Sequence, residues 1–189
     1  MPIEELLAIV RNQPDPHQAW AQVLELCGTE QPSKLWASLP KVDLDRDAEA
    51  ARAWLVGALA NTQVPTGVYL GLDTLNMEGG KGSNVEVGWI AADTSQGNAD
   101  WAYGGLTYGE PFLIAGLLAL HDVYSLPQWD DDFSFADYVL FLAYSGLVIR
   151  EALNGFTIAA PMLFAWGFHD GDLFCLCRSE GNKIEMLCS

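Results

Sequence analysis

Two acidic residues on neighbouring strand-like segments form the best candidate for a polar site. The segments TGVYLGLDTLN and NVEVGWIAAD, residues 66–76 and 84–93, alternate apolar and polar positions, which is typical of the two strands of a hairpin. Burial of one apolar face is greatest when Leu72 faces Val87. That register sets Asp73 directly opposite Glu86. Beside them it leaves a bare strip of two facing glycines, Gly71 and Gly88.

A pair of facing carboxylates needs something to offset its repulsion, because like charges directly opposed across two strands are destabilising. A divalent cation, a proton shared between the two groups, or a basic side chain such as Lys81 or Arg150 would serve. His121 and Asp122, near the end of an apolar helical segment, are the natural further members of this ligand site. The chemistry predicted here is that of an enzyme or of a binder of a small ligand or divalent metal.

A second cluster of reactive side chains, WGFHDGDLFCLC at 166–177, is better explained as a hairpin turn than as a metal site. Asp170-Gly171 is a typical central pair of a two-residue hairpin loop. The turn pairs each thiol with an aromatic side chain, Cys175 with Trp166 and Cys177 with Phe164. Zinc would require nitrogen or sulfur ligands beside the thiolates. We therefore expect all four cysteines of the chain to be reduced, with Cys175 and Cys177 buried on one apolar face.

Other motifs that carry chemistry are missing from the sequence. The stretch GGKGS at 79–83 lacks the Ser or Thr that follows Gly-Lys in a phosphate-binding loop, and it joins two strands, so it predicts a hairpin tip. No GxSxG or HExxH pattern occurs. We expect no cofactor and assign no catalytic residue.

Charge is the strongest global signal. The chain has 25 acidic and 9 basic residues, a formal net charge of −16, and no Lys or Arg between Lys81 and Arg150. Such a surface repels phosphate backbones and anionic headgroups, so we expect neither nucleic-acid nor membrane binding. It attracts a basic protein instead. The expected partner-binding acids lie within the base-free stretch: Asp93, Asp100, Asp130, Asp131 and Asp132.

The elements that position these groups can be predicted from periodicity. Residues 1–61 are typical of helices, one of which begins at Asp15-Pro16 with the aspartate as N-cap. Two strands follow, then two apolar helices at about 111–124 and 134–154, then strand-like segments from about 157 to 188. This order predicts a single α+β domain over 1–189. Its antiparallel sheet, an early hairpin plus a three-stranded C-terminal meander, would be covered by the two apolar central helices.

Length and composition bound the class of protein. The 189 residues, half of them hydrophobic, suffice for one ordinary core. The start MPIEELLAIVRN lacks the basic and apolar regions of a secretory signal, so we expect a cytoplasmic location. We expect a non-enzymatic protein that binds a basic macromolecular partner. In charge and size, although not in motif, it is similar to small acidic immunity proteins that neutralise bacterial toxins. The alternative is the enzyme or ligand binder that uses the carboxylate pair.

Overall fold

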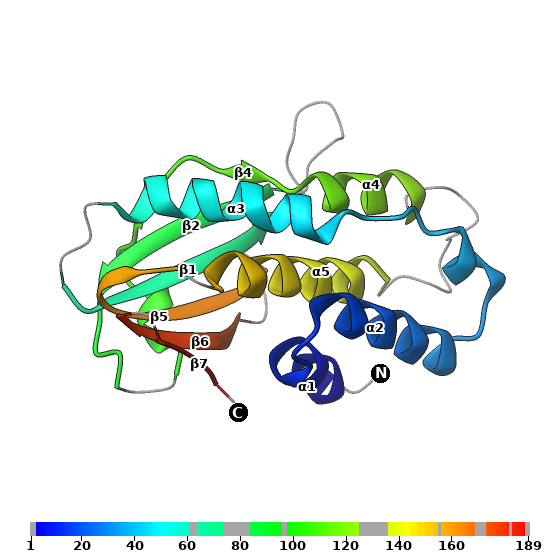
Figure 1. Ribbon diagram of the computed structural model, residues 1–189, viewed down its shortest axis with the longest axis horizontal. Coiled ribbons are helices and arrows are strands. Elements are labelled where there is room, and N and C mark those ends of the chain that lie inside the picture. Colours follow the sequence, from blue (N-terminus) through cyan, green and yellow to red (C-terminus); the bar gives the residue numbers. More distant parts are fainter. Residues whose placement is uncertain are drawn as a thin grey trace.

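Five α-helices and a seven-stranded sheet build the described part of the protein (Figure 1). The computed structural model describes residues 3–60, 64–73, 84–95, 98–124, 136–154, 156–168, 173–181 and 183–187. The helices are α1 (Ile3–Asn12), α2 (Pro16–Glu30), α3 (Leu44–Leu59), α4 (Ala115–Tyr124) and α5 (Ala136–Leu153), with short 3-10 helices η1 (Lys34–Ser38) and η2 (Asp100–Tyr103). The strands are β1 (Thr66–Asp73), β2 (Asn84–Ala91), β3 (Thr107–Tyr108), β4 (Phe112–Leu113), β5 (Ile158–Phe168), β6 (Leu173–Gly181) and β7 (Lys183–Met186).

The sheet is mixed rather than antiparallel. Its order is β3-β2-β1-β5-β6-β7, with β4 also paired to β2. The predicted hairpin β1–β2 and the meander β5–β6–β7 are both present, so the α+β class is confirmed. The two units meet through β1 and β5, which run parallel, so the prediction of an antiparallel sheet is wrong at this pairing. The chain that carries α4 and α5 returns to the starting end of β1 before β5 begins, as a parallel neighbour requires.

Alternate residues of the central strands face the helices. Val68, Leu70 and Leu72 of β1 are buried in the same core cluster as Phe164 and Trp166 of β5. Figure 1 shows α5 along the middle of the molecule, with α3 and α4 on one side and α1 and α2 on the other. All four pack on α5. This explains why α5 is apolar nearly all round, because a helix surrounded by other elements has no solvent face.

The helix ends follow local capping rules, but one helix begins later than expected. Asp15 caps α2 as predicted, since its side chain accepts from the main-chain N–H groups of His17 and Gln18. The helix α4 begins at Ala115 and not near Pro111, because residues 112–113 pair with β2 as strand β4. The N-cap of the second apolar helix, predicted at Ser134, lies outside the described residues.

The opposite face of the sheet is covered by the segment that contains η2. A Cβ atom on Gly67 of β1 would overlap the ring of Trp101, so the indole lies directly on the strand. Arg178 of β6 fixes the same layer, because its guanidinium donates to the carbonyl oxygens of Thr94 and Ser95 at 2.6 and 3.0 Å. The sheet therefore has a covering on both faces, helical on one and irregular on the other.

Candidate functional site

The two carboxylates of the first hairpin are not directly opposed. The register is shifted by two residues from the predicted one, so Glu86 faces Gly71 and Asp73 faces Asn84. A shift of two leaves every side chain on its predicted face, which is why the apolar pattern does not distinguish the two registers. The bare glycine strip is also missing. A Cβ on Gly71 would overlap the Tyr69 ring, and Tyr108 lies against Gly88.

His121 and Asp122 do not join these carboxylates. Both belong to the last turns of α4, on the helical side of the sheet, where the His121 ring lies 6.4 Å from the ring of Phe141 and Asp122 is exposed. Glu86 alternates with Val85 and Val87, which are buried toward the helices, and so it belongs to the other face. The strand pairing therefore does not set Asp73 opposite Glu86, and α4 carries His121 and Asp122 on the other side of the sheet from Glu86. Within the described ranges, no group of three or more His, Cys, Asp or Glu is placed to hold a metal ion.

Arg150, one of the predicted basic partners of the pair, binds elsewhere. Its Nη1 donates to the carbonyl oxygen of Val10 at the end of α1. Lys81, the other predicted partner, lies outside the described residues, as do His169, Asp170, Gly171 and Asp172.

The two thiols of β6 face opposite sides of the sheet. Cys177 faces Phe164 as predicted, but a bulge follows, and Cys175 faces Ala165 while Phe174 takes the place opposite Trp166. The bulge adds one residue to β6. The residues of β6 before the bulge are therefore displaced by one position, so their side chains lie on the opposite face from the predicted one. Cys177 is fully buried and Cys175 half-buried, so the prediction of two thiols on one apolar face is wrong for Cys175. Cys27, Cys175 and Cys177 are free thiols, and Cys188 lies outside the described residues.

The acids predicted to form a partner-binding surface are placed in part. Asp93 and Asp100 are exposed on the segment that covers the second face of the sheet. Each carboxylate also stabilises its own turn, since Asp93 accepts from the Ser95 hydroxyl and Asp100 accepts from the Asn98 amide. The run Asp130, Asp131 and Asp132 lies outside the described residues.

Most of the arginines donate hydrogen bonds to the main chain. Four of the five arginines in the sequence donate to main-chain carbonyl oxygens, which carry no net charge. Arg52 donates to Glu151 and Ala152 at 2.9 Å, and thereby satisfies two carbonyl groups at the end of α5. The others with such bonds are Arg11, Arg150 and Arg178. A guanidinium used in this way fixes the fold through uncharged acceptors, although Arg178 also lies 3.8 Å from the Glu185 carboxylate.

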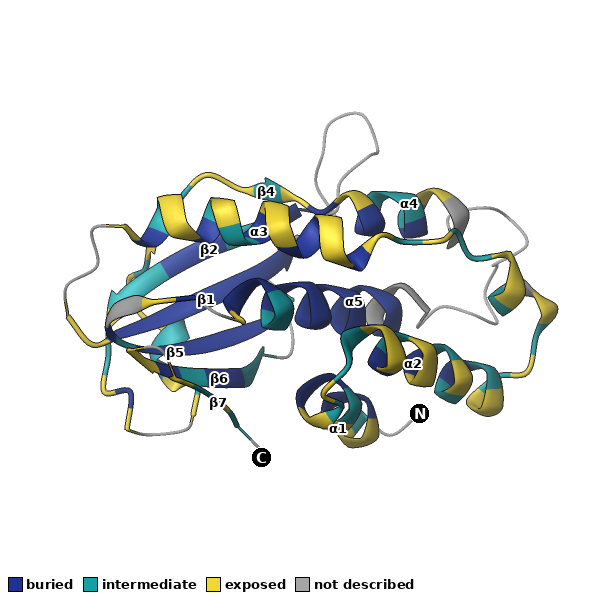
Figure 2. Cartoon of the chain, in the orientation of Figure 1, coloured by how far each residue is buried: buried dark blue, intermediate teal, exposed yellow. Residues whose placement is uncertain are grey.

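An acidic groove lies between α1 and α2. It has a volume of about 360 Å³. Its apolar part is Ile9 of α1 and Leu26 of α2, both half-buried, and exposed Glu5 and Glu25 line it from either helix. Figure 2 shows exposed residues, in yellow, along the outer surfaces of these two helices. Residues 12–33 contain no Lys or Arg, a signal in the sequence that the longer base-free stretch at 82–149 obscures.

Asp47 is a buried acid that the sequence pattern did not single out. Its side chain is 4% exposed, and its Oδ2 accepts from the Gly116 N–H at 2.8 Å and from the Tyr144 hydroxyl at 2.9 Å. Burial first, and then the Asp47 charge, raises the pKa of Tyr144, so the phenol keeps its proton and donates. The carboxylate thus joins α3, the first turn of α4 and α5. Its surroundings indicate a structural role.

The comparisons with known proteins assign no family. No family model matches the chain, and neither a curated protein nor a solved structure matches it. Among the described helices, none is long and apolar enough to cross a bilayer. The groove between α1 and α2 brings apolar and acidic side chains together and has no basic side chain in its lining.

Proposed function

We propose that the protein is a non-enzymatic binding protein that takes a basic segment of another protein into the groove between α1 and α2. The observation that carries the proposal is the pairing of an apolar floor, Ile9 and Leu26, with acidic walls, Glu5 and Glu25. An apolar side chain of the partner would fill the floor, and lysines or arginines on either side of it would meet the glutamates. This is the common anatomy of a helix or peptide held in a groove.

Charge supports the same partner class. The net charge of −16 accelerates the encounter with a basic protein and slows the encounter with an acidic one. Nine basic residues cannot neutralise 25 acidic ones, so much of the acidic surface remains to attract a partner. The sequence-based hypothesis of an inhibitor-like protein with a basic partner is thus kept, with a new location for the contact.

The test uses synthetic helical peptides, because the partner is defined here only by its chemistry. One peptide carries leucines one turn apart, flanked by lysines, and the second replaces every lysine by glutamate. A third keeps the lysines and replaces the leucines by serine. Fluorescence anisotropy of the labelled peptides gives Kd at low and high sodium chloride. We expect only the first peptide to bind, and its Kd to rise with salt because screening weakens attraction between exposed charges.

Two matched variants locate the contact. The double variant Glu5→Gln/Glu25→Gln removes the groove charges, and Glu49→Gln/Glu180→Gln removes two exposed charges on α3 and β6. Both remove two negative charges from the net −16, so long-range attraction changes equally. We expect the first to weaken binding by roughly twofold to tenfold, as exposed charge pairs are worth up to about 1 kcal/mol each, and the second to have a smaller effect. Equal weakening by both, or equal binding of the lysine and glutamate peptides, would overturn the proposal.

A further inference from the structure

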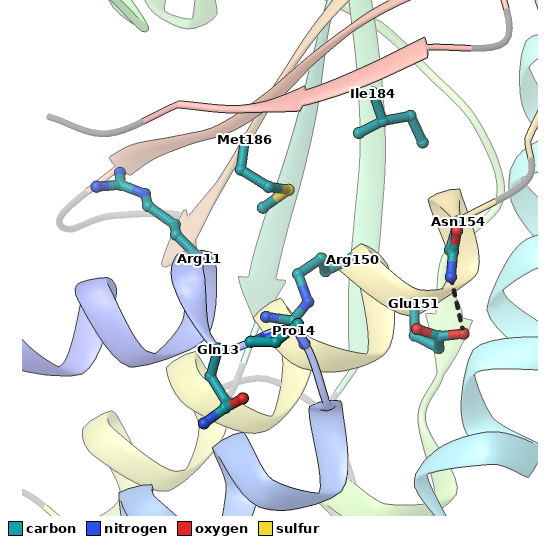
Figure 3. Close-up of a pocket in the computed structure, with 8 residues that line it drawn as sticks. All are labelled: Arg11, Gln13, Pro14, Arg150, Glu151, Asn154, Ile184 and Met186. Carbon is teal, nitrogen blue, oxygen red and sulfur yellow. Dashed lines mark hydrogen bonds between the residues drawn. The ribbon is translucent and has the colours of Figure 1, made fainter.

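A second cavity lies where the end of α1, the end of α5 and strand β7 meet. Its volume is about 220 Å³. Figure 3 shows Ile184 and Met186 extending from β7 toward Arg150 and Glu151 of α5, with Arg11 of α1 at the side. This volume is below the range of about 300–1,000 Å³ that holds drug-sized ligands, so it suits a small molecule.

Arg150 gives the cavity a positive charge, and Arg11 lines it from α1 with its guanidinium turned toward β6. Arg11 is 6% exposed, donates to the Cys175 carbonyl oxygen at 2.6 Å, and lies 5.8 Å from the centre of the Trp166 ring. Arg150 donates from Nη1 to the Val10 carbonyl oxygen. Its Nη2 is buried and has no hydrogen-bond partner in the part of the chain that the structure describes. A buried charged donor without an acceptor is costly, and an anionic ligand would remove that cost.

Burial also disfavours the charged form of Arg150. Burial lowers its pKa, and the charges of Glu151 and Asp15 oppose that effect only in part. A carboxylate bound at the guanidinium would raise the pKa of Arg150 again, because an opposite charge in contact favours the charged form.

The remaining walls are acidic and apolar. Glu151 lies next to Arg150 in sequence and accepts from the Asn154 amide at a long 3.5 Å, which leaves most of the hydrogen-bonding capacity of its carboxylate for a ligand. Ile184 and Met186 provide the apolar side and are both half-buried. The cavity therefore presents a cation, an anion and an apolar surface together.

We propose that this cavity binds a free amino acid with an apolar side chain. The carboxylate of the ligand pairs with Arg150, its ammonium group with Glu151, and its side chain packs on Ile184 and Met186. A zwitterion has no net charge, so the acidic protein does not repel it. An inorganic phosphate, by contrast, would meet Glu151 as a like charge and would leave the apolar wall uncovered.

Ligand analogues test the proposal on the unaltered protein. The probes are leucine, leucinamide without the carboxylate, N-acetyl-leucine without the ammonium group, and glycine without the side chain. Thermal melting is followed as each probe is titrated, since a ligand that binds only the native state raises Tm. We expect leucine to raise Tm in a concentration-dependent manner and each analogue to be at least several-fold weaker. No response to leucine, or an equal response to all four probes, would overturn the proposal.

A pair of arginine variants then assigns the contact. Arg150→Met removes the proposed carboxylate ligand, and the control Arg178→Met removes an arginine that also donates to main-chain carbonyls but lies outside the cavity. We expect Arg150→Met to weaken leucine binding by roughly tenfold to a hundredfold, the usual worth of a hydrogen bond to a charged group, and the control to bind as the unaltered protein does. If Arg150→Met does not fold, Glu151→Gln replaces it, with weaker leucine binding expected. Leucine binding unchanged in Arg150→Met or in Glu151→Gln would contradict the assignment.

Discussion

At the scale of single residues, charged groups in this protein divide into those that hold the fold and those that face solvent. Asp47 belongs to the first kind, because its carboxylate accepts hydrogen bonds from α4 and α5 at once. Asp45, two positions away, belongs to the second, since it is exposed and pairs with His17 at 3.0 Å. Burial and donor geometry, not residue type, separate their roles.

The substitution Asp47→Ala tests this division. It leaves the Gly116 N–H and the Tyr144 hydroxyl buried without their acceptor, so we expect the free energy of unfolding to fall by roughly 2–5 kcal/mol. The control Asp45→Ala removes only an exposed ion pair and is expected to cost less than about 1 kcal/mol. Urea denaturation measures both. Similar losses for the two variants would show that Asp47 does not join the helices.

Cys27 predicts a pH dependence of stability. Burial raises the pKa of its thiol from the ordinary 9.0 to about 12. Above pH 9 the unfolded chain therefore loses this proton while the native protein retains it, so stability is complete below pH 9 and declines as pH rises toward 12. Urea denaturation at neutral pH and just above pH 9 should show a smaller decline for Cys27→Ala than for the unaltered protein. Equal declines would mean that the thiol is not shielded in the native state.

At the scale of elements, periodicity predicted which segments form helices and strands and which faces they bury. It placed the hairpin, the meander and the apolar helices, because each depends on a local pattern of side chains. It did not predict the register in which neighbouring strands pair. The two-residue shift of β1 against β2 conserves the buried faces, and the bulge beside Cys175 has no signature in the apolar pattern. The facing of Asp73 and Glu86 required a particular register, whereas the place of His121 and Asp122 depended on which face of the sheet α4 covers.

The junction of α4 and α5 offers a prediction at this scale. A Cβ on Gly116 would overlap the Tyr144 ring, so Gly116→Ala should force the two helices apart and lower the free energy of unfolding by about 1–3 kcal/mol. The control Gly57→Ala lies in α3 with nothing within 4 Å of the added methyl group. It should raise stability by about 0.5–1 kcal/mol, because alanine favours a helix over glycine. Chemical denaturation tests whether the free energy of unfolding changes in opposite directions in the two variants. An unchanged free energy of unfolding for Gly116→Ala would contradict the close contact.

At the scale of the whole molecule, the acidic balance acts together with the fold. Composition predicted a basic partner, but it did not predict where the charge gathers beside an apolar floor. That depends on how α1 and α2 pack on α5, which turns Glu5 and Glu25 outward around Ile9 and Leu26. The helix α1 also carries Arg11 into the second cavity, so one short helix contributes to both proposed sites.

The central claim is the location of the partner on α1 and α2, and hydrogen exchange of the main-chain amides tests it most directly. The full chain is exchanged with and without the lysine-flanked leucine peptide, and local protection is compared. We predict that added protection gathers in residues 3–30, around the groove. Protection confined to the segment with Asp93 and Asp100, or none in α1 and α2 when the peptide is bound, would contradict it.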